Sequence, residues 1–264
     1  MLKRLLITGA AGGIGKMIRP HLTDLAETLR LSDINDLGDA AANEELIACD
    51  LGDEAAVHKL VAGCDGILHL GGISVEDRFD KILNANIQGV YNLYEAARAN
   101  GLPRIIFASS NHTVGFHQQD KHLDANANLQ PDGLYGVSKC FGEAMASMYH
   151  NKFGQETAIV RIGSCLPEPT DQRKLATWLS LEDFISLIAC AFRSPRLGCP
   201  IIYGASDNDA SWWDNSAAAY LGWRPKDNSA VFRDKVYANV PIADKDAALA
   251  KYQGGDFIND PIFR

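Results

Sequence analysis

The sequence predicts an α/β fold in which a doubly wound parallel sheet is followed by a small C-terminal cap. Two observations predict this fold. Short apolar runs alternate with longer stretches of helical periodicity from the N-terminus to Ile162, and a glycine-rich turn joins the first run to the first helical stretch. Strands that alternate with helices imply right-handed crossovers, which build a parallel sheet covered by helices on both faces.

The apolar runs are read as buried strands because they are short and rich in Ile, Leu and Val. In chain order they span residues 4–8, 28–32, 45–49, 66–70, 104–109, 157–162 and 200–204. The helical stretches between them include residues 54–61, 87–100, 135–153 and 181–192. We expect residues 1–162 to form the sheet core, and residues 163–264 to form a cap interleaved with the last sheet elements, in one compact unit. The segment after about Ala230 carries no clear signal.

Composition limits the class of protein. Of the 264 residues, 47% are hydrophobic and 22% are charged, which is typical of a globular chain. The net charge of −8 and the absence of Lys/Arg blocks argue against nucleic-acid or membrane partners. No segment is apolar enough to span a bilayer, so we expect a soluble, cytoplasmic protein. The six cysteines have no metal-ligand spacing, and we expect no metal.

The first turn carries a glycine pattern typical of dinucleotide binding. Gly9, Gly12 and Gly15 lie between the first strand and the first helix. Glycines there let the backbone turn tightly and approach a pyrophosphate. Asp33 closes the second strand, where a carboxylate accepts hydrogen bonds from both adenosine ribose hydroxyls and repels a 2′-phosphate. The pattern predicts a Rossmann-type domain that binds NAD rather than NADP, with a simple capped turn as the alternative.

Other strand ends can complete this cofactor site. Asp50 ends the third run, where it can meet the adenine amino group or cap the following helix. Gly71 and Gly72 end the fourth run, where they can let a cofactor pass close to the backbone or form an ordinary turn. The residues expected to contact NAD are Gly9, Gly12, Gly13, Ile14, Gly15, Asp33, Ile34, Asp50, Leu51, Leu70, Gly71, Gly72, Ile73, Ser74, Tyr135 and Lys139.

Tyr135 and Lys139 lie one helical turn apart, and Ser109 and Ser110 end the fifth run. A free phenol has a pKa of about 10, so it is a poor base at neutral pH. An ammonium on the same helix face, with a cationic nicotinamide nearby, would lower that pKa. A serine hydroxyl could hold the reacting oxygen beside the phenol. The pair alone is more often incidental, but with the glycine loop and Asp33 it predicts proton transfer coupled to hydride transfer.

These residues resemble the short-chain dehydrogenase/reductase superfamily, extended type. The resemblance rests on "TGAAGGIG", "NANIQGVYNLYEAA", "FASS" and "YGVSK", and it runs from the N-terminus to about Ile162. It implies that Ser110, Tyr135 and Lys139 form the catalytic set and that Asn86 shapes the active-site helix. Members of the superfamily commonly pair through helices, which implies a homo-oligomer.

The stretch "VRIGSCLPEPTDQRKLATWLS" narrows the resemblance, as do "SSNHTVGFH" and the chain length. They resemble dehydrogenases that oxidise D-galacturonate and D-glucuronate at the anomeric carbon to the aldaro-lactone and pass hydride to NAD. This resemblance implies that Cys165 lies beside the nicotinamide and that Arg173 holds the carboxylate of an anionic sugar. Without it, an arginine in this loop would be interpreted as a solvated charge. The residues implied to contact substrate are Ser74, Ser110, Asn111, His112, Ser164 and Arg173.

Other functions stay open at this point. An NAD-dependent sugar or sugar-nucleotide epimerase would keep its cofactor through each cycle, and a non-catalytic NAD sensor would not need the Ser–Tyr–Lys set. A dehydrogenase of a neutral sugar would not need Arg173. His112 and His117 suggest a metal pair only weakly, because no carboxylate or cysteine completes it. The four tryptophans could stack on sugar, although packing in the cap is the default for Trp178, Trp212, Trp213 and Trp223.

Overall fold

The computed structural model describes residues 1–263, and its main sheet has seven parallel strands in the order β3-β2-β1-β4-β5-β6-β9. The predicted doubly wound sheet is therefore confirmed, and each predicted strand lies within two residues of an observed one. Chain order reverses between β1 and β4, which is where such sheets bind ligands. The strands are β1 (Leu2–Thr8), β2 (Ala26–Asp33), β3 (Glu44–Ala48), β4 (Gly66–His69), β5 (Arg104–Ser110), β6 (Thr157–Ile162) and β9 (Ile201–Gly204).

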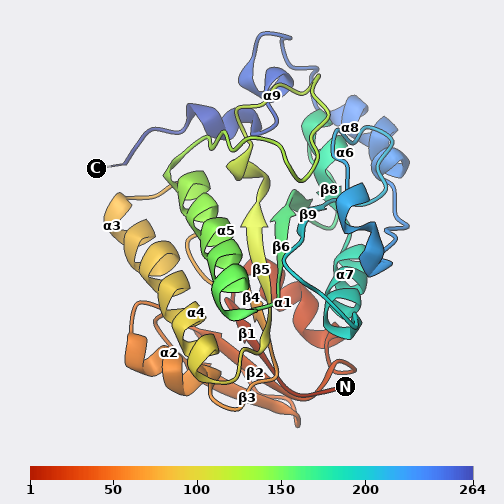
Figure 1. Cartoon of the computed structure of the whole chain (residues 1–264). Helices are drawn as coiled ribbons and strands as arrows, with labels where there is room; N and C mark the ends of the chain where they lie inside the picture. Colours follow the sequence, from red (N-terminus) through yellow and green to blue (C-terminus); the bar gives the residue numbers. More distant parts are fainter. Residues whose placement is uncertain (264) are drawn as a thin grey trace.

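Helices cover both faces of the sheet (Figure 1). One face carries α1 (Gly13–Ile18), which continues into η1 (Arg19–His21), and α7 (Leu181–Arg193). The other face carries α2 (Glu54–Val61), α4 (Gly89–Ala99) and α5 (Leu134–Phe153). Alternate strand residues enter the two cores: Leu5 and Ile7 face α1 and α7, whereas Leu6 faces α2 and α4. This alternation is the period of two expected of a strand buried on both sides.

One helix begins earlier than predicted. Helical structure starts with α3 (Phe79–Ile82), passes through the π-helical turn η2 (Leu83–Gln88) and continues as α4, whereas residues 87–100 were expected. A π-helical turn inserts an extra residue into the helix and re-aims its side chains, often at a functional site. Here the turn buries Asn86, whose side chain contacts Ile73 in the loop after β4.

The chain after Ile162 completes the sheet and covers its carboxyl edge. It supplies α7 and β9 to the sheet, and also a small two-stranded sheet of β7 (Ser164–Cys165) and β8 (Trp178–Leu179). The division into a core and a cap at residue 162 stays a prediction. The remaining elements are η3 (Asn111–Thr113), α6 (Gln172–Thr177), η4 (Ser216–Leu221), η5 (Ser229–Phe232), α8 (Arg233–Asn239), α9 (Ala248–Lys251) and η6 (Gly255–Asn259).

A buried ion pair fixes α5 against the sheet. Arg161 of β6 donates to Glu143 of α5 at 2.9 Å from Nε and 2.8 Å from Nη2, and its Nη1 donates to the Tyr203 hydroxyl at 3.1 Å. Ser109 of β5 donates to the same carboxylate at 2.6 Å. A buried charge pair is stable only when its hydrogen-bonding capacity is used in this way. The network sets the position of α5 relative to the ends of β5 and β6.

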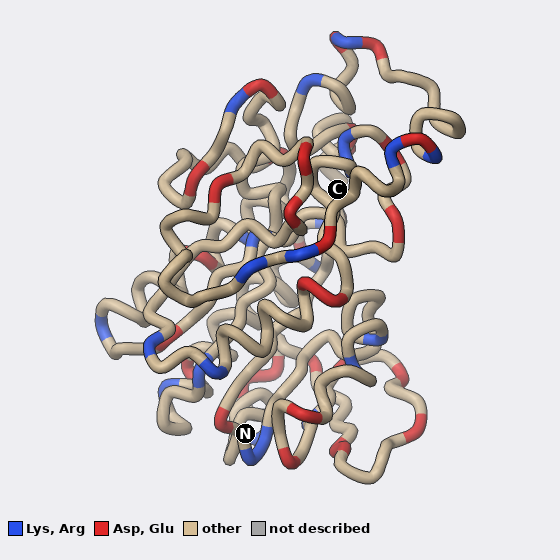
Figure 2. The backbone as a smooth tube through the Cα atoms, turned by 90° about the vertical axis from the view of Figure 1, so that its right-hand side faces the viewer, with Lys and Arg blue, Asp and Glu red and all other residues tan. Residues whose placement is uncertain are grey.

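Charged side chains are dispersed over the molecule. Figure 2 shows Lys and Arg interspersed with Asp and Glu along the chain, with no broad basic stripe on the side that it views. This agrees with the net charge of −8. Within residues 1–263, no helix combines the length and the apolar composition needed to cross a membrane.

Candidate active site

The glycine turn after β1 forms a close-packed cradle. Gly9 has φ +70°, and a Cβ added to it would lie 2.7 Å from the backbone nitrogen of Gly71. A Cβ on Gly15 would lie 2.4 Å from the Gly9 carbonyl oxygen, so α1 packs directly on the turn. A Cβ on Gly13 would meet no atom within 4 Å, so this side of the turn is open. The loop therefore fits the close approach of a pyrophosphate that the sequence predicted.

Asp33 ties the glycine turn to the end of β2. Its Oδ2 accepts from the backbone nitrogen of Ala11 at 3.0 Å, and its Oδ1 accepts from the backbone nitrogen of Asn35 at 2.9 Å and from Asn35 Nδ2 at 3.1 Å. Because a carboxylate can accept about four hydrogen bonds, the second acceptor site of Oδ2 is left for a ribose hydroxyl. Ile34, the next residue, is exposed at the same strand end.

Asp50 does not cap α2, so that alternative is wrong. The cap is Asp53, whose Oδ1 accepts from Ala56 N at 3.0 Å. Asp50 lies three residues farther from the helix and instead accepts from Gly52 N at 2.8 Å and from Asn84 Nδ2 at 3.3 Å. Its contact with adenine stays a prediction.

The end of β4 is joined to the helix that carries Tyr135. Gly72 has φ +122°, and a Cβ there would lie 2.6 Å from Asn86 Oδ1. Asn86 accepts from the backbone nitrogen of Ile73 at 2.7 Å and donates from Nδ2 to Ser138 Oγ at 2.8 Å. Ser138 lies between Tyr135 and Lys139 on α5. These contacts give a physical account of how Asn86 could shape the active-site helix.

Tyr135 and Lys139 are both buried on α5, with Ser110 at the end of β5. Lys139 Nζ donates to the Ala108 carbonyl at 2.8 Å and lies 5.7 Å from the Tyr135 ring centre. Burial lowers the pKa of Lys139 to about 8. Burial raises the pKa of Tyr135 to about 12; its hydrogen bond with Ser110 opposes this rise, and Asp132 adds to it. In the protein alone, desolvation therefore outweighs the nearby ammonium, and the lowering of the phenol pKa expected with a cationic nicotinamide beside it stays a prediction.

Two carboxylates that the sequence analysis did not identify support this group. Glu76, in the loop before α3, accepts from the backbone nitrogens of Leu134 and Tyr135, each at 3.0 Å, and so holds the first turn of α5. Asp132 Oδ2 pairs with His112 Nδ1 at 2.8 Å. Glu76 lies far along the chain from Leu134 and Tyr135, and Asp132 lies in an irregular loop, so no local sequence pattern marks either acid.

Arg173 is not a solvated loop residue. It lies on α6 and is 9% exposed. Its Nε donates to the Gln253 carbonyl at 2.6 Å. With the Asn111 amide oriented as its neighbours require, its Nη2 donates to the Asn111 side-chain oxygen at 2.7 Å. Burial lowers the pKa of Arg173. Of the ion pairs formed by residues 1–263, none includes this guanidinium.

A segment near the C-terminus, for which the sequence carries no clear signal, closes this group. We call residues 253–257 the C-terminal strap. It passes next to the loop after β5, where Gln118 and Tyr252 form an antiparallel bridge, and Figure 1 shows this dark blue segment above the carboxyl ends of the central strands. The ring of Phe257 lies 4.0 Å from that of His112 and 6.0 Å from that of Tyr135, centre to centre.

Residues 5–195 match the model of a family described as the NAD dependent epimerase/dehydratase family. This chain belongs to that family. The predicted resemblance is thereby confirmed. The chain is 58% identical over 263 residues to the uronate dehydrogenase of Agrobacterium fabrum, covering 100% of this chain and 99% of the relative. It is 53% identical to that of Pseudomonas putida, covering 96% and 95%.

Solved structures in this family match almost the whole chain. A mutant uronate dehydrogenase from Agrobacterium tumefaciens complexed with NAD superposes with a TM-score of 0.98 at 58% identity, covering 99% of each chain. Glucuronic acid dehydrogenase from Chromohalobacter salexigens superposes with a TM-score of 0.98 at 56% identity, covering 99% of this chain and 98% of that one.

The fold of this chain brings most of the predicted substrate residues together. Ser110, Asn111, His112, Tyr135 and Arg173 share the hydrogen bonds and ring contacts given above. Two others stand apart. Ser164 on β7 bonds to Thr177 Oγ1 at 2.9 Å, and Ser74 lies in the loop after β4; neither is hydrogen-bonded to the five within the described chain.

Cys165 is buried, and burial raises the pKa of its thiol to about 12, so it is not a thiolate at neutral pH. Among residues 1–263 there is no cluster of three or more His, Cys, Asp or Glu side chains placed to hold a metal.

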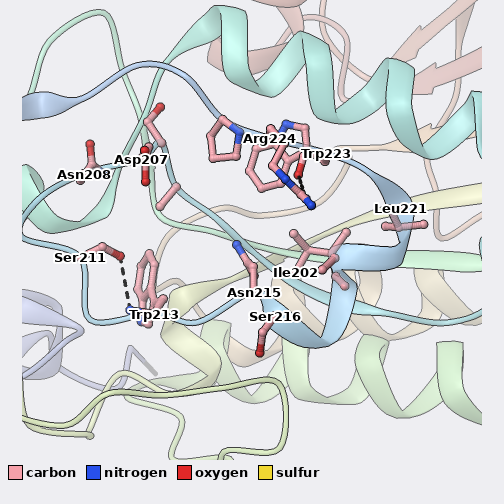
Figure 3. A pocket seen from close by; sticks show the side chains of 15 residues that line it. Ile202, Asp207, Asn208, Ser211, Trp213, Asn215, Ser216, Leu221, Trp223 and Arg224 are labelled. Carbon is pink, nitrogen blue, oxygen red and sulfur yellow. Dashed lines mark hydrogen bonds between the residues drawn. The ribbon is translucent and has the colours of Figure 1, made fainter.

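A separate hollow of about 290 Å³ lies beyond the edge strand β9 (Figure 3). Its lining includes Trp213, Trp223, Arg224 and Asn215, and none of the residues predicted to contact NAD or substrate. Trp213 stacks on Tyr203 with ring centres 5.1 Å apart. The remaining tryptophans, Trp178, Trp212 and Trp223, are buried, as the default interpretation of packing predicted.

Proposed function

We propose that this chain is an NAD-dependent dehydrogenase that oxidises a hexuronate, D-galacturonate or D-glucuronate, at the anomeric carbon to the aldaro-lactone. Three relatives named uronate dehydrogenase support this, and each is at least 51% identical to this chain. The observation that carries the proposal is the buried guanidinium of Arg173. Asp171, Asp132 and Asp256 act on this guanidinium only from a distance. A buried cation without a direct ion-pair partner is unfavourable, and an anionic group of the substrate would satisfy it.

The glycine cradle and Asp33 fit a dinucleotide. We assign the pyrophosphate to the open turn from Gly9 to Gly15 and the adenosine ribose to Asp33. NAD, when bound, supplies the hydride acceptor. The other predicted cofactor contacts, at the ends of β3 and β4 and at Cys165, belong to the same proposal.

The catalytic chemistry then follows from the positions of the side chains. Arg173 binds the carboxylate at one end of the sugar, and Ser110 and Tyr135 hold the anomeric hydroxyl at the other. Tyr135 accepts the hydroxyl proton as hydride leaves the anomeric carbon. Because burial keeps the phenol protonated in the protein alone, the positive charges of Lys139 and of oxidised cofactor must together favour the phenolate.

We also propose that the protein is a cytoplasmic homo-oligomer that pairs through helices. Apolar side chains are exposed on the helical layer of α4 and α5, among them Tyr91, Val137 and Met148. Such residues are expected to be covered by another copy. A monomer in light-scattering measurements at micromolar concentration would contradict this part of the proposal.

The function is tested by following NADH absorbance after the purified protein is mixed with NAD and one sugar at a time. We expect rapid NADH formation from D-galacturonate and D-glucuronate, only a weak rate from D-galactose, and much less product when NADP replaces NAD. NADH from D-galactose at a similar rate would show that no carboxylate is required. Tightly bound cofactor with no net NADH from any sugar would indicate the epimerase.

A further inference from the structure

The side chain of Gln253 anchors the C-terminal strap. It is 0% exposed, its Oε1 accepts from Trp213 Nε1 at 2.8 Å, and its Nε2 donates to the carbonyls of Gln118 at 3.2 Å and Lys121 at 2.9 Å. Its backbone nitrogen donates to the His117 carbonyl at 2.8 Å. A buried amide with its donors and acceptor paired is held in one orientation, so the Gln253 carbonyl has a fixed place as well.

The backbone of the strap lies directly on Arg173. The Gln253 carbonyl accepts from Nε at 2.6 Å, and a Cβ on Gly255, which has φ +66°, would lie 2.6 Å from Arg173 Cδ. On the other side, a Cβ on Gly254 would lie 1.9 Å from Asp132 Oδ2. The two glycines let the strap pass between Asp132 and Arg173, so the strap determines where the guanidinium can lie.

The contacts of Arg173 leave one edge of its guanidinium available. Nε is bound to Gln253 and Nη2 to Asn111. A guanidinium has five N–H donors, so the two Nη1 donors and one Nη2 donor stay free of hydrogen bonds to residues 1–263. Nη1 and Nη2 together can bind a carboxylate bidentately.

We propose that Gln253 is a positioning residue for substrate specificity. Its side chain fixes its own carbonyl, and that carbonyl directs the free edge of Arg173 toward the substrate carboxylate. The inference rests on the proposed function, because that function assigns the carboxylate to Arg173. The contact joins residues that are 80 positions apart in the sequence.

Trp213 and Trp223 provide a matched pair of variants. Both line the hollow beyond β9, and Figure 3 shows Trp213 at one edge of it with its backbone nitrogen bonded to Ser211. Trp213 Nε1 donates to Gln253, whereas Trp223 Nε1 donates to Ser186 Oγ at 3.0 Å, away from the strap. Gln119 is a second control, because its side chain donates to the Leu249 and Tyr252 carbonyls just before the strap and not to Gln253.

The test measures steady-state kinetics with D-galacturonate and the affinity for NAD by calorimetry. Misplacing a substrate-holding group is expected to raise KM, so Gln253→Ala and Trp213→Phe should each raise it about tenfold, with kcat and NAD affinity nearly unchanged. Gln119→Ala and Trp223→Phe should leave KM close to that of the wild type. Equal KM values for Trp213→Phe and Trp223→Phe would overturn the proposal. This comparison tests it even if Gln253→Ala does not fold.

A double-mutant cycle separates the positioning role from general loosening. If Gln253 acts through Arg173, then Gln253→Ala or Trp213→Phe should not raise KM further when Arg173 is already Met. Multiplicative effects of the two changes would overturn the positioning role. An Arg173→Met variant with unchanged KM for D-galacturonate would instead overturn the carboxylate site of the proposed function, and with it this inference.

Discussion

Tyr135→Phe is expected to reduce turnover of D-galacturonate by about 10²- to 10⁴-fold, the range that a positioned general base contributes. The change removes the only atom of the side chain that can accept the substrate proton and leaves the ring packed between His112 and Phe257. NAD affinity, measured by calorimetry, should be nearly unchanged. NADH formation at saturating NAD gives the rate.

Tyr149→Phe is the matched control. Tyr149 lies on the same helix and is buried, but its hydroxyl bonds to Glu95 and not to any predicted site residue. This variant should keep kcat close to that of the wild type. Full activity of Tyr135→Phe, or an equal loss in both variants, would remove the assignment of Tyr135 as the base.

Arg173→Met is expected to raise KM for D-galacturonate by about 10- to 100-fold. A hydrogen bond to a charged group contributes about 1.5 to 3 kcal/mol, and about 1.4 kcal/mol corresponds to a factor of ten. Met keeps much of the buried volume but cannot bind a carboxylate. The weak rate with D-galactose should not fall, because that sugar has no carboxylate for Arg173 to bind.

The neighbouring residue provides the control for this prediction. Lys174 lies on the same helix, is partly exposed and pairs with Asp171. Lys174→Ala should leave KM for both sugars unchanged, because surface ion pairs contribute little. A fall in activity with D-galactose as large as that with D-galacturonate in Arg173→Met would show that Arg173 supports the fold rather than the carboxylate.

The elements predicted well are those whose signal is local. All seven sheet strands appear as short apolar runs, because a strand buried on both faces needs apolar side chains in succession. The glycine turn is equally local, since Gly9 has a positive φ and Gly15 contacts the turn within a few residues. The start of this helix at Phe79 was missed because α-helical spacing in α3 (Phe79–Ile82) changes to π-helical spacing in η2 (Leu83–Gln88), so the first turns show no single period.

The site was predicted in part for the same reason. Ser110, Tyr135 and Lys139 could be predicted because each has a recognisable place in the sequence: Ser110 ends an apolar run, and Tyr135 and Lys139 lie one helical turn apart. Glu76 and Phe257 were missed because their roles come from partners far along the chain. The assignment of Arg173 to substrate needed a resemblance, since one arginine among polar residues looks solvated.

The sequence by itself determined the order in which the candidate functional groups follow one another along the chain. The glycine turn comes first, then an acid at the end of the second strand, and then a serine at the end of the fifth strand and a Tyr–Lys pair on the helix after it. Only the tertiary structure decided that the strap after Tyr252 closes on Arg173 and that burial raises the pKa of Tyr135 in the protein alone. The physical reason is that backbone conformation and periodicity depend on neighbours in sequence. Burial, desolvation and the pairing of charges depend on segments that meet only when the chain has folded.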